Sequence, residues 1–118
     1  MTLQHVSLEV READVPAELR FWALLGFDAV EPPGSLGERS AWVQRDGRQI
    51  HLMFTGEPTV PPRGHAAVVA VDYDATVSAL RDAGHPPEER ERHWGAPRAF
   101  VRTPAGHRVE VMAAPPPR

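Results

Sequence analysis

Four side chains that can bind a divalent metal stand at similar places in four apolar, strand-like runs of the chain. Three are histidines and one is a glutamate, and in each run the aliphatic neighbours lie at odd offsets from the polar residue. Because side chains on a strand alternate between its two faces, we expect all four to point away from the face that packs on helices. They are His5, His51, His65 and Glu110.

The composition limits which other groups can take part in chemistry. The 118 residues include no cysteine, which excludes disulfides and thiolate metal sites and leaves His, Glu or Asp as metal ligands. A net charge of −3, with both signs interspersed, gives no support for a nucleic acid or a membrane as partner. The N-terminus has no signal pattern, and no apolar run reaches the roughly 20 residues that span a bilayer. We therefore expect a cytoplasmic protein of one domain.

The first half of the chain predicts a strand, a helix and three further strands. The helix begins near Asp14, a suitable N-cap, and ends at Gly26, a natural residue after a helix. Its apolar stripe, Phe21, Trp22 and Leu25, is expected in the core. Asp46-Gly47 favours a hairpin turn. The expected strands are residues 2–10, 27–31, 40–44 and 48–55.

The second half repeats this order after the proline-bearing linker 57–63. Its expected elements are a strand at 64–71, a helix at 74–83 ended by Gly84, a loop or poor edge strand at 86–93, and strands at 99–102 and 107–112. The spacing between the polar residues supports a duplication, since His5 and His51 are 46 positions apart and His65 and Glu110 are 45 apart. We predict module 1 at about 1–56, module 2 at about 64–113 and a tail at 114–118, within one domain spanning 1–118.

These runs resemble the vicinal oxygen chelate superfamily, which includes glyoxalases, bleomycin resistance proteins and extradiol dioxygenases. The local marks of the resemblance are residues 5–10, 20–27, 64–65 and 103–110. It implies an α+β fold in which two tandem βαβββ modules form a curled mixed-sheet cup with a divalent metal at its base. The family ligands fall on the first and last strand of each module. Here they are His5, His51, His65 and Glu110.

Two positions depart from the pattern of bacterial glyoxalase I enzymes. Those enzymes usually carry a Glu where this chain has His51, and two carboxylates near their metal take part in moving a proton. Glu110 as the single carboxylate argues against methylglyoxal detoxification itself. Thr103 stands where the family often has Asp, a change expected to affect turn packing.

The donor set suits zinc, nickel, cobalt, manganese or iron. Four protein ligands in an octahedral shell leave two positions for neighbouring oxygens of a small substrate. Glu110 is the first candidate for moving a proton, and His51 is either a fourth ligand or an acid–base group. Arg98 is expected to orient an anionic substrate. Further cup residues to consider are Ser7, Glu9, Trp42, Met53, Trp94 and Met112, while His85, His93 and His107 have no matched partner and are expected to be exposed.

Three functions are compatible with the resemblance. The leading one is a metal-dependent lyase or isomerase of the glyoxalase type acting on a small oxygenated substrate. His5, His65 and Glu110 alone form a 2-His-1-carboxylate set, which keeps an iron(II)-dependent extradiol-type dioxygenase open. A metal-free drug-binding protein of the bleomycin resistance type is the third, with Trp42 and Trp94 available for an aromatic guest. The resemblance also implies a homodimer, in which each cup combines modules of two chains or of one.

Overall fold

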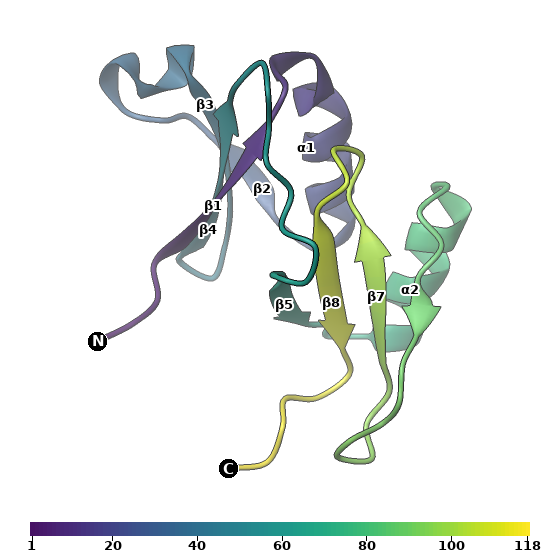
Figure 1. Cartoon of the computed structure of the whole chain (residues 1–118). Helices are drawn as coiled ribbons and strands as arrows, with labels where there is room; N and C mark the ends of the chain where they lie inside the picture. The colour runs from purple at the N-terminus through teal and green to yellow at the C-terminus, as the bar shows by residue number, and fades with distance from the viewer. The chain divides into compact units, whose positions relative to one another are not determined.

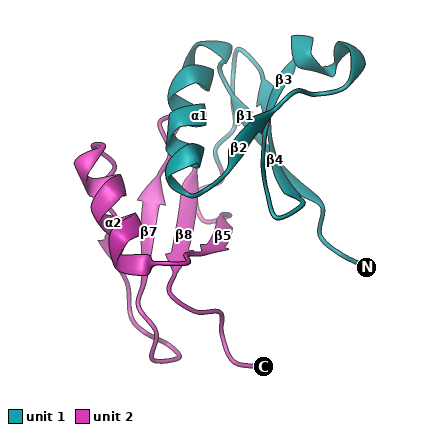
Figure 2. Cartoon of the chain, turned by 180° about the vertical axis from the view of Figure 1, so that it is seen from behind, with its two compact units in different colours: residues 1–60 teal, residues 61–118 magenta.

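The computed structural model describes all residues from 1 to 118, and the chain divides into two compact units. Unit 1 comprises residues 1–60 and unit 2 comprises residues 61–118 (Figure 2). Each unit holds one four-stranded mixed sheet and one α-helix (Figure 1). None of the helices is long and apolar enough to cross a membrane.

Unit 1 follows the order strand, helix, three strands. Its sheet has the strand order β1-β4-β3-β2, with β1 parallel to β4 and the other pairs antiparallel. Two short 3₁₀ helices, η1 and η2, precede α1 and β3. The elements are β1 (His5–Val10), η1 (Glu12–Asp14), α1 (Val15–Leu24), β2 (Asp28–Val30), η2 (Gly34–Glu38), β3 (Ser40–Arg45) and β4 (Arg48–Phe54).

Unit 2 repeats this topology. Its sheet has the order β5-β8-β7-β6, again with the first and last strands of the unit parallel to each other. The elements are β5 (Ala66–Val69), α2 (Tyr73–Asp82), β6 (Glu88–Glu89), β7 (Arg98–Arg102) and β8 (Arg108–Met112). The predicted α+β class with two tandem βαβββ modules is therefore confirmed.

The glycine-containing turns form where the sequence predicts them. Gly26 and Gly84 follow the two helices with φ of +85° and +89°, values that favour glycine. At both ends the next residue donates its N–H to the carbonyl five positions back, from Phe27 to Trp22 and from His85 to Leu80. The two modules thus end their helices in the same way.

One face of each sheet supplies the core. In unit 1 this face carries Val10, Val43 and Leu52, which are fully buried. In unit 2 it carries Val109 and Val111, also fully buried. Phe21 and Trp22 of α1 and the following Leu25 are buried as predicted, and Val77 and Leu80 of α2 are also buried.

Two expectations for local structure were wrong. Asp14 occupies the N-cap position of α1, but its side chain makes no capping hydrogen bond because the preceding η1 turn holds its backbone in a helical conformation. His107 is only 3% exposed. It precedes Val109 and Val111 at even spacing, so strand alternation places it on the core side. His93 is exposed as expected, and His85 is half-buried.

The two sheets repeat one strand register. Across β1 and β4, His51 pairs with the second residue after His5. Across β5 and β8, Glu110 pairs with the second residue after His65. His5 and His65 are therefore equivalent, as are His51 and Glu110, and all four belong to the sheet face opposite the core.

Candidate functional site

Three rings are stacked on the open face of the unit 1 sheet. Trp42 on β3 pairs with His51 on β4, and their ring centroids lie 3.8 Å apart with the planes 2° from parallel. His5 on β1 covers the other side of His51, at 4.0 Å and 13°. His51 is thus held between two rings and is only 7% exposed. Alternation and register together bring these three side chains to one place.

Side-chain amides fix the orientation of both imidazoles. Gln49 Oε1 lies 2.8 Å from His51 Nε2, and Gln4 Oε1 lies 2.8 Å from His5 Nδ1. Because an amide oxygen only accepts, the neutral rings carry their protons on these nitrogens, which leaves His51 Nδ1 and His5 Nε2 with free lone pairs. Burial, and then the nearby His5, lower the pKa of His51 below its usual value. The neutral form that can bind a metal or accept a proton is therefore favoured.

Unit 2 places a carboxylate between a histidine and an arginine. Glu110 on β8 is 8% exposed. Its Oε1 lies 3.2 Å from His65 Nε2, and its Oε2 accepts a hydrogen bond from Arg98 Nη1 at 3.1 Å. Arg98 also donates through Nε to the carbonyl of Glu91. Arg98 therefore holds one carboxylate oxygen, while the other faces the imidazole.

The tautomer of His65 decides what its second nitrogen can do. Nδ1 lies 2.8 Å from the carbonyl oxygen of Arg63, which can only accept, so Nδ1 carries a proton. The hydrogen bond between Nε2 and Glu110 Oε1 needs a proton on one of the two atoms, and a metal ion would take the place of that proton. Two ligands each bound at about 2.1 Å and at right angles lie about 3 Å apart, so this spacing suits a pair that shares one ion. A backbone carbonyl on the far nitrogen is also the usual support for a metal-binding histidine.

His5 and His51 in unit 1, and His65 and Glu110 in unit 2, are donors of the kinds that bind divalent metals. No group of three or more His, Cys, Asp or Glu side chains is placed to hold an ion in the structure. In unit 1 the stacked rings of His5 and His51 meet through their π surfaces, so the exposed His5 has to turn before both can bind one ion. In unit 2 His65 and Glu110 already face each other across 3.2 Å.

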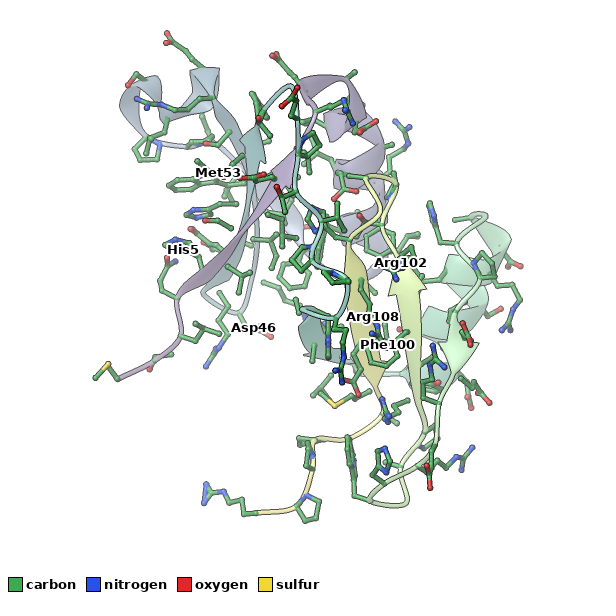
Figure 3. The ribbon with its side chains drawn as sticks, in the orientation of Figure 1. His5, Asp46, Met53, Phe100, Arg102 and Arg108 are labelled. Atoms are coloured by element: carbon green, nitrogen blue, oxygen red, sulfur yellow. The ribbon has the colours of Figure 1, made fainter.

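The other residues expected around a site are distributed over both units. Ser7 is exposed and pairs with His51, whereas Glu9 accepts a hydrogen bond from the Thr59 N–H. Met53 is half-buried on β4, and Figure 3 shows it and His5 in unit 1. Met112 is buried and pairs with Arg98. Trp94 lies between β6 and β7 and donates its indole N–H to the carbonyl of Ala114.

Sequence reasoning missed three residues near the predicted ones. Gln49 fixes His51, and Phe100, which pairs with Glu110, meets the ring of His65 edge-on at 4.9 Å. Arg108 lies over the face of Phe100, 3.7 Å from the ring centroid. The signal was present in the strand alternation, since Gln49 and Arg108 each precede a predicted ligand by two positions. What was lacking was the strand register that pairs Phe100 with Glu110.

The comparison with known families agrees with this fold. The model of the Glyoxalase/Bleomycin resistance protein/Dioxygenase superfamily matches residues 2–111. The chain therefore belongs to this superfamily. No curated protein sequence matches it.

Solved structures of the same fold carry different functional names. A protein assigned to the glyoxalase family from Bacillus anthracis aligns with a TM-score of 0.84 at 20% identity, covering 95% of this chain and 93% of that one. Lactoylglutathione lyase from Agrobacterium tumefaciens aligns with a TM-score of 0.70 at 19% identity, covering 94% and 92%. The fosfomycin resistance protein FosX from Listeria monocytogenes aligns with a TM-score of 0.75 at 18% identity, covering 97% and 91%. At these identities the likeness is one of fold.

Proposed function

We propose that this protein is a divalent-metal-dependent enzyme of the glyoxalase type, a lyase or isomerase acting on a small oxygenated substrate. The ligand set is His5, His51, His65 and Glu110. It is completed when a first module and a second module come together, either in one chain or in a dimer. The superfamily membership and the fold are the background to this proposal, and the donor pairs are its specific support.

The observation that carries the proposal is the repetition of a donor pair at one register. Module 1 has its two donors on its first and last strands, and module 2 has one directly before its first strand and one on its last strand, all on the face opposite the core. If His5 and His51 had only a structural role, a second donor pair at the equivalent positions of module 2 would not be expected. A shared role for both pairs explains the repetition, and the family's metal supplies that role.

Glu110 and His51 have separate proposed roles in the reaction. A bound divalent ion would polarise the oxygens of a chelated substrate. Glu110 is positioned to accept a proton at Oε1, because Arg98 occupies Oε2 and fixes the plane of the carboxylate. His51, kept neutral by its buried stack, is the second group able to accept a proton. Trp42 and His5 cover the two faces of the His51 ring and shield it from water.

The test is elemental analysis of untagged protein, comparing wild type with His65→Ala and Glu110→Ala. We expect near-stoichiometric metal in the wild type and loss of metal in both variants. His93→Ala, which removes an exposed histidine, is the matched control and should keep the metal. Zinc, nickel, cobalt or manganese would support proton transfer, whereas iron would favour the dioxygenase reaction. Wild type that stays metal-free after incubation with each ion would contradict the proposal.

A further inference from the structure

A cavity lined by arginines lies in unit 2, beside the candidate site residues but without them. Its volume is about 440 Å³, within the range of small-molecule sites. Phe100 and Arg102 reach it from β7 and Arg108 from β8, and Figure 3 labels these three side chains. Its remaining charged or titratable lining residues are Arg90, His85 and Glu88.

The positive charge in this cavity is only partly neutralised. Glu88 is the single carboxylate of the lining, and it pairs with Arg90 at 3.3 Å. Arg102 makes one hydrogen bond, to the carbonyl of Gly106, and no ion pair. Arg108 is half-buried and makes no hydrogen bond or ion pair, and its guanidinium lies over the ring of Phe100. Two guanidinium groups with free N–H donors therefore share one cavity.

The strand register makes this arrangement unfavourable without a counter-charge. Arg102 and Arg108 are directly opposite each other across β7 and β8. Like charges at opposed positions destabilise an antiparallel pair. At the equivalent positions of unit 1 the chain has Gln44 and Gln49, whose side chains hydrogen-bond at 2.7 Å. The same register thus holds a hydrogen-bonded neutral pair in one module and a cationic pair without a counter-charge in the other.

We propose that the arginine cavity binds an oxyanion group of a small molecule, either a carboxylate or a phosphate. Arg108 is pre-oriented by Phe100, so its planar fork is available for a bidentate contact, and Arg102 supplies a second cation across the strand pair. None of the proposed metal ligands lines the cavity, so anion binding does not depend on them. If the proposed function also holds, the edge contact of Phe100 with His65 places this anionic group next to the reactive end of the substrate.

The test is a titration of metal-free, full-length protein with inorganic phosphate and, separately, with acetate. NMR chemical shifts of the backbone amides monitor binding. We expect saturable chemical-shift changes at residues 100–108. The anion that binds more tightly identifies the preferred group. Arg108→Gln and Arg102→Gln should each weaken binding about tenfold or more, since each removes a charge-assisted contact. Arg48→Gln is the matched control, because Arg48 also faces an arginine, Arg45, across a strand pair but lies in unit 1.

The melting temperature gives a second test, which does not require the natural ligand to be known. The double variant Arg102→Gln, Arg108→Gln copies the neutral pair of unit 1 and should melt at a higher temperature than wild type in the absence of anions. Phosphate should raise the melting temperature of the wild type and not that of the double variant. Absence of shifts with both anions, or equal binding by wild type and Arg108→Gln, would overturn the proposal. Metal content plays no part in either result, so failure here is distinct from failure of the metal site.

Discussion

Module 1 has His51 on its last strand, β4, where module 2 has Glu110 on its last strand, β8. His51 is packed between the rings of Trp42 and His5. Glu110 lies instead between His65 and Arg98, in a charged network. The ring across the strand pair is also replaced, Trp42 by Phe100. The duplicated backbone therefore kept its strand register, while the side chains on its open face diverged.

The core face changed less than the open face. Leu52 and Val111 occupy equivalent positions next to His51 and Glu110, and both are fully buried aliphatic residues. Both helices end in the same glycine turn. The core of each module therefore preserves the fold, and the open face is where the two modules acquired different chemistry.

The largest effect on stability should come from truncating these core residues. Leu52→Ala should lower the free energy of unfolding by about 2–5 kcal/mol, because it leaves a cavity in a site without solvent access. Val111→Ala removes fewer buried groups and should lower it by about 1–3 kcal/mol. Urea unfolding of the two variants measures both values. A smaller loss in Leu52→Ala than in Val111→Ala would show that the two cores are not equivalent.

Removing the ring that covers His51 tests the difference between the open faces. Trp42→Ala exposes the imidazole to water and should raise its pKa toward the usual value, because burial is the main cause of the lowered pKa. Phe100→Ala at the equivalent position of module 2 should leave the pKa of His51 unchanged. Histidine Cε1–H NMR titrations of the three metal-free proteins compare these values. The same pKa in wild type and Trp42→Ala would contradict the role of the stack.

The lowered pKa of His51 also predicts a pH dependence of stability. The folded-state pKa lies below the unfolded value, so the unfolded chain binds the proton more readily. The contribution is fully present above the ordinary pKa of 6.5 and is lost as the pH falls through the folded-state pKa. Metal-free wild type should therefore lose stability over this window, and His51→Asn should lose less. Parallel urea titrations at several pH values check this, and identical slopes would contradict it.

The smallest expected effect on stability comes from the N-cap residues, which differ between the two helices. Asp72 caps α2 by accepting a hydrogen bond from the Ala75 N–H, whereas Asp14 makes no such bond at the start of α1. Asp72→Ala should lower the free energy of unfolding by about 1 kcal/mol, and Asp14→Ala should change it much less. Thermal unfolding of both variants provides the measurement. Equal losses would mean that the side chain of Asp14 caps α1 in solution.

Local sequence signals predicted the elements well because their causes are local. Alternation separated His5, His51 and Glu110 from the core residues beside them, and Asp46-Gly47 forms its hairpin with φ of 51° and 74°. His107 shows the limit of this reasoning. It was treated as an isolated histidine, although its spacing from Val109 assigns it to the core face.

The contacts of the open faces could not be predicted, because they depend on strand register. Arg98 was expected to meet a substrate, yet in the structure it donates to Glu110, a neighbour set by the pairing of β7 and β8. The stack of Arg108 on Phe100 has the same origin. Whether Arg98 also contacts a substrate stays a prediction.

The central claim is that the unlike donor pairs of the two modules serve one metal ion. Native mass spectrometry of metal-loaded protein measures the number of ions per chain most directly, for wild type, His51→Ala in module 1 and Glu110→Ala in module 2. We expect one ion per chain in the wild type and loss of that ion in both variants. Two ions per chain, or an ion kept in full when either module's donor is removed, would contradict it.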